Sequence, residues 1–396
     1  MERTVIVVGG GAAGLMAAVA AARSKARVIL LEQNEKVGRK LAATGNGRCN
    51  FTNTQMRRDA YRGTSPDFAY GALEKVNVQE TIGFFSRLGI YTVNKDGWIY
   101  PRSGQALSVI EVLQKELQYR KVKMKTREHV TEILPGKNPG QWAVKTDTWT
   151  YEGDAVILAC GSKASQIPGS SEEGYRLAGQ LGHNIVEPLP ALVPLCCKGK
   201  SFSSWSGVRT EGSVTLCING IPLKKETGEL QLTEYGISGI PVFQISRYAV
   251  RALWEGSQVG VLLDFMPEFT PEGLAALFEE RRKNCPYKST KELLVGMFPA
   301  KLIEVLAKEE DLIQGIKEYS LEVTKAHSFE SAQICSGGVN VTEISPETME
   351  SRLHKGIYFA GEMIDIDGAC GGYNLQWAWS SGMVAGTMAA RKEGEL

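Results

Sequence analysis

Four short apolar runs, far apart in the chain, predict the strands of one buried sheet. They are Val5–Val8, Arg27–Leu31, Asp154–Ala159 and Ile357–Ala360. Strands buried on both faces have continuous apolar runs instead of alternating polar and apolar positions. The pattern therefore predicts an α/β fold whose main sheet uses segments from both ends of the chain.

Helices are predicted where apolar residues recur at helical spacing or where small residues dominate. Leu15–Ala22 is rich in Ala, which favours a helix that packs closely. The other predicted helices are Val78–Leu88, Ala106–Tyr119, Glu172–Leu181 and about Asn374–Ala390. Four short segments between them predict a small β-meander: Lys121–Thr126, His129–Leu134, Trp142–Thr146 and Thr148–Glu152.

The pattern changes near Pro188, where a Pro-rich stretch leads out of the first domain. Val193–Asp264 has the pattern of strands with turns, which predicts an antiparallel sheet or barrel, and Pro271–Ile316 is helical. Lys317–Val323 and Phe329–Ile334 are predicted as strands that return to the barrel. We therefore expect a nucleotide-binding domain at 1–189 and 338–396, a barrel at 190–267 and 317–337, and a helical insertion at 268–316.

The first strand is followed by a glycine-rich turn of the G-x-G-x-x-G type, formed by Gly9, Gly11 and Gly14. In such turns the first glycine allows a sharp bend, the second lets a pyrophosphate approach, and the third lets the helix pack on the strand. Glu32 ends the second strand, where a carboxylate accepts hydrogen bonds from ribose hydroxyls. Together these features predict a dinucleotide site, but they leave FAD and NAD open.

The segment after Glu32 is a long loop that we expect to wrap an anionic cofactor. Gly38, Gly45 and Gly47 argue against a stable helix there, and Arg39, Lys40 and Arg48 provide cations for phosphate. In the next stretch, Arg57, Arg58 and Arg62 are predicted to form a solvated charged face. Trp98, Tyr100 and Arg102 either face a ligand or close a hairpin, and the pattern does not decide between the two.

Charge and composition bear on whether the protein binds nucleic acid, a membrane or a metal. The net charge is +1, which argues against general affinity for nucleic acid or anionic membrane but leaves a local basic patch open. The eight cysteines include no C-x-x-C and the four histidines form no cluster, so we expect no metal. No apolar run reaches membrane-spanning length, and the first strand follows the first residues at once. We therefore expect a cytoplasmic protein without a membrane segment.

A second helix N-terminus near the C-terminal end of the chain favours FAD. Ile357–Ala360 is followed by Gly361-Glu362, and Gly371-Gly372 then opens the last long helix. One helix terminus suits the pyrophosphate, and the other can stabilise negative charge on a reduced flavin ring. No second G-x-G-x-x-G follows Gly14, so any NAD(P)H is expected to bind transiently near the flavin.

Several motifs resemble one flavoprotein family over nearly the whole chain. They are VVGGGAAGLMAA, TGNGRCNFTN, PALVPL, LTEYGISGIPVFQIS and GEMIDIDGACGGYNLQWAWSSG. The chain is similar to the BaiN/RdsA-like FAD-dependent oxidoreductases. The resemblance implies FAD and a Rossmann-like FAD-binding domain, interrupted by a β-barrel that carries a helical insertion. We expect the FAD to be non-covalent, because Glu32 suits an adenosine ribose and no His or Cys is singled out by its placement for flavin attachment. The implied FAD contacts are Gly9, Gly11, Ala12, Ala13, Gly14, Glu32, Gln33, Arg39, Lys40, Gly45, Asn46, Arg48, Cys49, Asn50, Val130, Ala159, Cys160, Gly161, Gly361, Glu362, Asp367, Tyr373, Asn374, Leu375 and Gln376.

The family includes bile-acid reductases, a ribosomal-RNA dihydrouridine synthase and an aminoacetone oxidase, so the resemblance leaves the substrate open. We expect a reductase that passes hydride from a flavin, itself reduced by NAD(P)H, to an activated C=C of a small molecule such as a steroid-like enone. Tyr373, Cys370 and Tyr100 are the candidate proton donors, although each can equally be a packing residue. A dihydrouridine synthase, an amine oxidase that produces peroxide and a non-catalytic flavin protein remain alternatives. The oligomeric state is left open.

Overall fold

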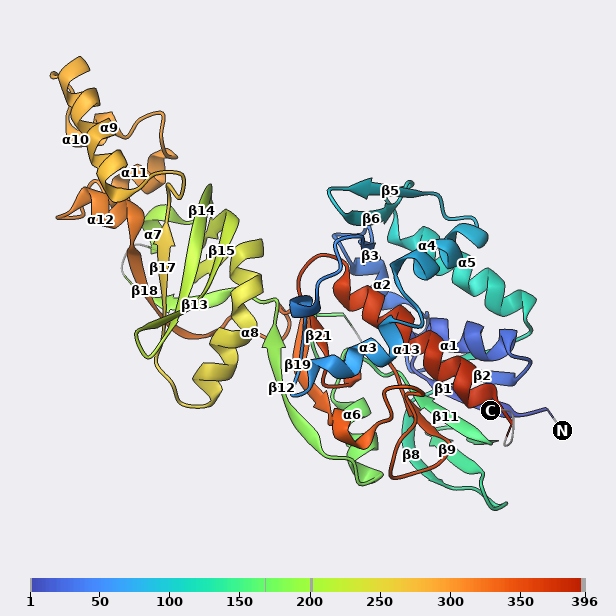
Figure 1. The fold of residues 1–396 in the computed structure, drawn as a ribbon. Coiled ribbons are helices and arrows are strands. Elements are labelled where there is room, and N and C mark those ends of the chain that lie inside the picture. Colours follow the sequence, from blue (N-terminus) through green and yellow to red (C-terminus); the bar gives the residue numbers. More distant parts are fainter. Residues whose placement is uncertain (1, 168, 200–201, 393–396) are drawn as a thin grey trace. The chain divides into compact units, whose positions relative to one another are not determined.

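The computed structural model describes residues 2–167, 169–199 and 202–392, and the chain separates into two compact units (Figure 1). The first unit contains Met1–Pro188 and Ile334–Leu396. The second contains Leu189–Gln333. The first unit is therefore assembled from both ends of the chain.

The centre of the first unit is a parallel sheet with the strand order β20-β11-β1-β2-β7. Its strands are β1 (Thr4–Val8), β2 (Arg27–Glu32), β7 (Lys123–Thr126), β11 (Ala155–Leu158) and β20 (Ile357–Phe359). All four apolar runs are confirmed as its strands. The prediction for Lys121–Thr126 was wrong in one respect, because β7 is the edge strand of this sheet and not part of the meander. Its polar sequence fits an edge, where most of its side chains are exposed.

Two small sheets and two strand pairs complete the strands of this unit. The meander contains β8 (Val130–Pro135), β9 (Trp142–Thr146) and β10 (Thr150–Gly153); a second sheet contains β3 (Thr52–Asn53), β5 (Thr92–Lys95) and β6 (Trp98–Pro101). The short strands β4 (Tyr61–Arg62) and β21 (Asp367–Gly368) pair with each other, as do β12 (Ile185–Ala191) and β19 (Ile334–Val339). The Trp98–Tyr100 segment thus closes a hairpin, as one of its two interpretations predicted.

The helices of the first unit agree with most of the predicted ranges. They are α1 (Ala12–Arg23), α2 (Arg39–Ala43), α3 (Tyr70–Leu73), α4 (Val78–Arg87), α5 (Ala106–Tyr119), α6 (Glu173–Gln180) and α13 (Tyr373–Ala390), with short 3₁₀ turns at Arg58–Ala60, Pro66–Ala69, Val341–Glu343 and Gly361–Met363. The helix α2 corrects the prediction of a wholly irregular loop. Its glycines flank the helix instead of interrupting it, since Gly38 is the N-cap and Gly45 follows the end.

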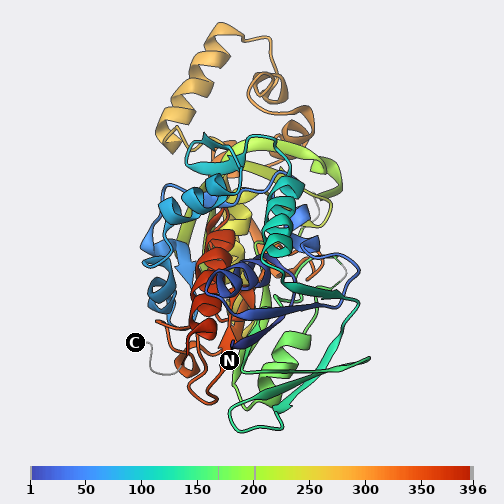
Figure 2. The ribbon, with the colours of Figure 1, turned by 90° about the vertical axis from the view of Figure 1, so that its right-hand side faces the viewer.

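Helices α1 and α13 lie side by side because small residues line their contact (Figures 1 and 2). A Cβ atom added at Gly382 would lie 2.5 Å from the carbonyl oxygen of Ala13. A Cβ at Gly386 would lie 2.2 Å from the carbonyl oxygen of Ala17. The two helix backbones therefore touch, and the N-terminus of α13 is held at the sheet that also positions α1.

The second unit is built on a closed antiparallel barrel with the strand order β13-β16-β15-β14-β17-β18. The strands are β13 (Leu195–Lys198), β14 (Val208–Ile218), β15 (Ile221–Leu232), β16 (Gly236–Ser238), β17 (Val259–Asp264) and β18 (Tyr319–Ala326). Between β17 and β18 the chain forms α9 (Pro271–Asn284), α10 (Thr290–Leu293), α11 (Ala300–Leu306) and α12 (Leu312–Lys317). The short helix α7 is Phe202–Trp205.

Two predictions for this unit were wrong. The segment predicted as strands contains the helix α8 (Ile240–Trp254), which packs against β14, β15 and β18. Its buried residues Val242, Ile245 and Ala249 have helical spacing, so the signal was present in the sequence. Phe329–Ile334 is not a barrel strand, because β19 begins at Ile334 and pairs with β12.

Candidate functional site

The glycine-rich turn between β1 and α1 has the geometry that a dinucleotide needs. Gly9 has φ +103°, and a Cβ there would lie 2.5 Å from the carbonyl oxygen of Ala159. A Cβ on Gly14 would lie 1.9 Å from the carbonyl oxygen of Gly9. A Cβ on Gly11, in contrast, would meet no atom within 4 Å. The first and third glycines thus allow close packing, while the second faces open space at the N-terminus of α1, where Ala12 and the buried Ala13 follow it.

Glu32 lies at the carboxyl end of β2 and is 8% exposed. Its Oε2 accepts the N–H of Gly10 over 2.8 Å, and its Oε1 accepts the N–H of Asn34 over 2.8 Å. The side-chain amide of Asn34 also donates to Oε1, over 2.7 Å. A carboxylate has about four lone-pair sites, so Oε2, with one donor, keeps capacity for a ribose hydroxyl. The carboxylate therefore stands beside the glycine-rich turn, held by protein N–H groups.

The cationic side chains of the loop after β2 have different interaction partners. The ammonium of Lys40 lies 2.8 Å from Oε2 of Glu362, so its charge is met by a carboxylate. The guanidinium of Arg39 donates to Oδ1 of Asn34, and that of Arg48 donates to the carbonyl of Gly45. Both arginine side chains are exposed and are free of carboxylate partners among the described residues, which leaves them suited to phosphate. The amide of Gln33 donates to the carbonyl of Gly169.

The ends of β11 and β20 bring together side chains from distant segments. Ser162, which sequence reasoning missed, donates to Oε1 of Glu362, which Lys40 also contacts. Nothing in the sequence singles out this serine beyond its place just after β11. Gly361 donates its N–H to Ser381 of α13 over 2.9 Å. Burial raises the pKa of the nearby Cys160 thiol to about 12, so this side chain is neutral.

The start of α13 shows which of its N–H groups are available to a ligand. Gln376 donates its backbone N–H to the carbonyl of Gly372, and its buried side-chain amide is bound by Thr52 and Thr81. Gln376 therefore supports the helix start and has no N–H left for a flavin. Earlier N–H groups in a first helical turn have no intrahelical partner, which leaves Asn374 and Leu375 as the donors there. The Asn374 side chain closes the turn by accepting from the N–H of Gly368.

Asn50 tests whether this site fits a flavin cofactor. Its side-chain amide is buried, yet neither its nitrogen nor its oxygen has a hydrogen-bond partner. Its Oδ1 lies 3.0 Å from the position that a Cβ on Gly372 would take, so the amide stands at the N-cap of α13. A buried amide without a partner costs about 1–3 kcal/mol, and a polar ligand group removes that cost. The residues present therefore fit a cofactor with polar ring edges.

The remaining predicted contacts lie around these groups. Asn46 and Cys49 have φ of +54° and +59° in the turn that also contains Gly45, and Cys49 is fully buried. Val130 begins β8 and is buried. Ala159 and Gly161 follow β11, and Asp367 is a buried residue of β21.

The structure distinguishes among the three candidate proton donors. The Tyr373 hydroxyl donates to the carbonyl of Gln55 over 2.8 Å. Burial raises the pKa of Cys370 to about 11. Burial also raises the pKa of Tyr100, while the Arg48 guanidinium, 5.9 Å from its ring centre, partly offsets this. Cys370 and Cys49 both act electrostatically on Tyr100, so these three side chains are neighbours. The Tyr100 hydroxyl has no hydrogen-bond partner among the described residues.

The predicted charged face is only partly formed. Arg57 and Arg58 are exposed and lie beside Asp59 and Asp67. Arg62 is 6% exposed, so the prediction that it belongs to a solvated face was wrong. Its strand β4 pairs with β21, which buries it. A continuous basic patch of these three arginines is therefore absent from the described surface.

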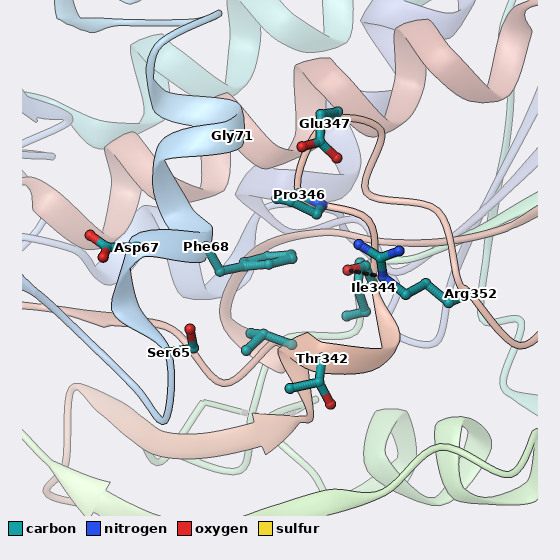
Figure 3. Close-up of a pocket in the computed structure, with 10 residues that line it drawn as sticks. Ser65, Asp67, Phe68, Gly71, Thr342, Ile344, Pro346, Glu347 and Arg352 are labelled. Carbon is teal, nitrogen blue, oxygen red and sulfur yellow. Dashed lines mark hydrogen bonds between the residues drawn. The ribbon is translucent and has the colours of Figure 1, made fainter.

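A pocket of about 440 Å³ lies elsewhere in the first unit, between the Ser65–Gly71 and Val341–Arg352 segments (Figure 3). Arg352 at its edge donates to the carbonyl of Ile344. None of the predicted cofactor residues lines it. Within the described ranges no group of three or more His, Cys, Asp or Glu side chains is placed to hold a metal. Nor is any helix of those ranges long and apolar enough to cross a membrane.

Comparisons with known proteins agree with this geometry. The family described as the HI0933-like protein Rossmann domain matches residues 3–388. The chain is 44% identical over 384 residues to the 3-dehydro-bile acid delta(4,6)-reductase of Clostridium scindens, and the match covers 93% of both chains. It is 28% identical over 386 residues to a ribosomal RNA dihydrouridine synthase of Haemophilus influenzae, covering 92% of this chain and 93% of that protein.

A solved structure supports the fold alone. The 3-ketosteroid delta1-dehydrogenase of Sterolibacterium denitrificans superposes with a TM-score of 0.51 at 13% identity, covering 98% of this chain and 100% of that chain. The expected Rossmann-type FAD-binding fold with a closed barrel is confirmed, and so is the class of FAD-dependent oxidoreductase. The chain belongs to the HI0933-like family of Rossmann-domain proteins.

Proposed function

We propose that this protein is a reductase that saturates an activated C=C bond of a steroid-like enone acid, using non-covalent FAD and NAD(P)H as the electron donor. The observation that supports it most is the 44% identity, over 93% of both chains, to a protein named as a bile-acid delta(4,6)-reductase. The 28% identity to dihydrouridine synthases is weaker, and Arg57, Arg58 and Arg62 form no continuous basic patch that would favour RNA.

The residues of the first unit have distinct parts in this reaction. The glycine-rich turn and Glu32 would hold the dinucleotide, and Asn50 with the first turn of α13 would offer polar groups to a flavin. Reduced FAD, when bound, supplies hydride for the β-carbon of the enone. Exclusion of water and orientation of the substrate come from the protein.

Tyr100 is our candidate for the proton donor. Its raised pKa keeps the hydroxyl protonated at neutral pH, and this hydroxyl has no protein acceptor among the described residues. Its O–H bond breaks as the proton is added to the α-carbon, so the C=C gains one hydride and one proton, and solvent then returns a proton to the phenolate. Tyr373 is less suited because its hydroxyl already donates a hydrogen bond to the backbone carbonyl of Gln55.

The reaction is tested by anaerobic mixing. The yellow protein is first bleached with NADH or NADPH and then mixed with a 3-keto-Δ4 steroid acid, with a uridine-containing ribosomal RNA fragment, or with air. We expect fast reoxidation by the enone and a product with one C=C fewer. Reoxidation by the RNA alone would instead indicate a dihydrouridine synthase, and fast reoxidation by air with peroxide would indicate an oxidase.

The proton donor is tested with Tyr100→Phe, which keeps the ring and removes the hydroxyl. We expect turnover to fall about 10²–10⁴-fold, with flavin content and the rate of bleaching by NAD(P)H unchanged. Tyr91→Phe is the matched control, because Tyr91 is 73% exposed. Equal turnover in the parent and Tyr100→Phe would exclude Tyr100 from the reaction.

A further inference from the structure

The buried amide of Asn50 stands out in the first unit, because the described residues give it no hydrogen bond. Its side chain is nine-tenths buried, with 9% exposed. Asn53 is also buried, but its amide is fully used: Nδ2 donates to the carbonyl of Gly371 over 2.8 Å, and Oδ1 accepts the N–H of Gln55 over 2.8 Å. Buried polar groups normally have partners, so the amide of Asn50 is open to a ligand.

The segment that carries Asn50 is fixed on both sides. The N–H of Phe51 donates to the carbonyl of Ile99 in β6, and the carbonyl of Phe51 accepts from the indole of Trp379 in α13 over 2.9 Å. Cys49 has φ +59°, a left-handed conformation that non-glycine residues rarely adopt. Such conformations persist where the surroundings impose them, and they cluster at ligand sites. The backbone therefore holds the Asn50 amide in one place.

The Asn50 amide lies beside the N-terminus of α13. Its Oδ1 is 3.0 Å from the position that a Cβ on Gly372, the N-cap, would take. The first N–H groups of a helix have no partner within it, and the first N–H of α13 that bonds back to Gly372 is that of Gln376. Asn50 thus adds an acceptor and a donor next to backbone donors that have no partner within the helix.

This combination complements a ring imide, in which an N–H stands between two carbonyl groups. An imide edge needs a donor, an acceptor and a second donor in a row. The carboxamide of Asn50 offers one donor and the acceptor, and the start of α13 offers the other donor. The isoalloxazine ring of FAD has such an edge at C2, N3 and C4, whereas the nicotinamide ring of NAD contains no imide.

We propose that Asn50 recognises the imide edge of the flavin, with Oδ1 accepting from N3–H and Nδ2 donating to the C4 carbonyl, while the first N–H groups of α13 face the C2 carbonyl. The inference rests on the FAD of the proposed function and is independent of its substrate. It makes Asn50 the residue that selects a flavin with a free N3–H.

The test compares FAD with 3-methyl-FAD, in which a methyl group replaces the N3 hydrogen. Flavin fluorescence during titration of the flavin-free full chain gives both affinities. The variant is Asn50→Leu, which keeps the approximate volume of the side chain and removes both polar atoms. We expect the parent to bind FAD about tenfold more tightly than 3-methyl-FAD, the scale of one buried hydrogen bond. Asn50→Leu should bind the two flavins equally, because it lacks the acceptor that distinguishes them.

Asn53→Leu is the matched control, because it removes the same amide from a neighbouring position that the protein itself uses. It should weaken both flavins alike and keep the preference for FAD, as would any general damage to the fold. Asn50→Asp keeps an acceptor oxygen, so it should also keep the preference while binding both flavins more weakly. An unchanged preference in Asn50→Leu, its loss in Asn50→Asp, or equal affinities in the parent would each overturn the inference.

The two proposals fail separately. If 3-keto-Δ4 steroid acids are reduced but Asn50→Leu keeps the preference for FAD, the inference fails and the proposed function stands. If the preference is lost as expected while no enone reoxidises the reduced flavin, the proposed function fails and the role of Asn50 stands. Uridine carries the same imide, so binding of uridine to the FAD-loaded parent that Asn50→Leu abolishes would assign the amide to a substrate base and overturn the inference.

Discussion

The backbone N–H of Gly10 donates a hydrogen bond over 2.8 Å to the carboxylate of Glu32, which thereby joins the glycine-rich turn to the end of the second strand. Glu32 also accepts the N–H of Asn34. One side chain therefore supports the turn that is predicted to bind a pyrophosphate, and its Oε2 remains able to accept from a ribose. Removal of the Glu32 carboxylate is therefore expected to weaken cofactor binding and to loosen the backbone of the glycine-rich turn.

Glu32→Ala is expected to weaken FAD binding by about 1–3 kcal/mol, the scale of lost charge-assisted hydrogen bonds. Flavin fluorescence measured during titration of the apoprotein gives the affinity. Glu32→Gln keeps the size of the side chain and one acceptor oxygen, so its loss should be smaller. FAD affinity equal to that of the parent in Glu32→Ala would refute the assignment.

Gly382→Ala is expected to lower the free energy of unfolding by about 1–3 kcal/mol, because the new methyl group would lie 2.5 Å from the Ala13 carbonyl oxygen. Gly179→Ala in α6 is the control, since nothing lies within 4 Å of its Cβ. Removing that exposed helical glycine should stabilise the protein by about 0.5–1 kcal/mol. Urea titration of both variants measures the difference, and equal losses would show that the contact between α1 and α13 is not the cause.

The start of α13 is expected to raise the reduction potential of the flavin, because its N–H groups favour the negative charge of the reduced ring. Asn374→Pro deletes one N–H while keeping a φ that suits a first helical turn. Asn374→Ala removes only the side chain that bonds Gly368, so it is the matched control. A potential lower by about 30 mV in Asn374→Pro than in Asn374→Ala corresponds to about 1.4 kcal/mol on a two-electron couple. Equal potentials, measured against a reference dye, would show that this helix does not tune the flavin.

The stability of the first unit is expected to fall in acid because of His183. Its side chain is fully buried, with Nδ1 3.2 Å from Glu343 and Nε2 2.9 Å from Ser351, and burial lowers its pKa below the ordinary value of 6.5. The unfolded chain therefore takes up a proton first. Stability is complete above pH 6.5 and is lost as the pH falls through the lower pKa of the folded state.

The measurement is the free energy of unfolding at pH 7.5 and at pH 5.5 for the parent, for His183→Gln and for His327→Gln. We expect the parent and His327→Gln, which changes an exposed histidine, to lose more stability in acid than His183→Gln. Each unit by which the pKa is lowered contributes about 1.4 kcal/mol. The same acid loss in all three proteins would contradict the role of His183.

The flavin is expected to be released by acid. Two of the predicted FAD contacts are cysteines: Cys49, in the turn that contains Gly45, and Cys160, just after β11. Burial raises the pKa of each thiol to about 12. A neutral thiol is a poor nucleophile, so these side chains are unsuited to a covalent flavin link. Precipitation with acid should leave all yellow colour in the supernatant, whereas colour in the pellet would show a covalent bond.

The sequence by itself determined the parts of this protein that depend on local pattern. Val5–Val8 and Asp154–Ala159 are apolar throughout because both faces of their sheet are covered, and Gly9, Gly11 and Gly14 mark a turn whose geometry only small residues permit. Those features predicted the fold and a dinucleotide site, while the preference for FAD came from the second helix N-terminus at Gly371-Gly372 and the family came from the resemblance of several longer motifs. The helix α8 was also encoded locally, by the spacing of Val242, Ile245 and Ala249, and was missed among strand-like neighbours.

Only the tertiary structure decided which distant groups meet. Lys40 reaches Glu362 and Ser162, and Gln376 is enclosed by Thr52 and Thr81, because segments hundreds of residues apart converge at one sheet edge. The polar strand Lys123–Thr126 joined the parallel sheet through its neighbour β2, which no local pattern specifies. The buried amide of Asn50 likewise has no hydrogen-bond partner among the described residues only because of what folding places around it.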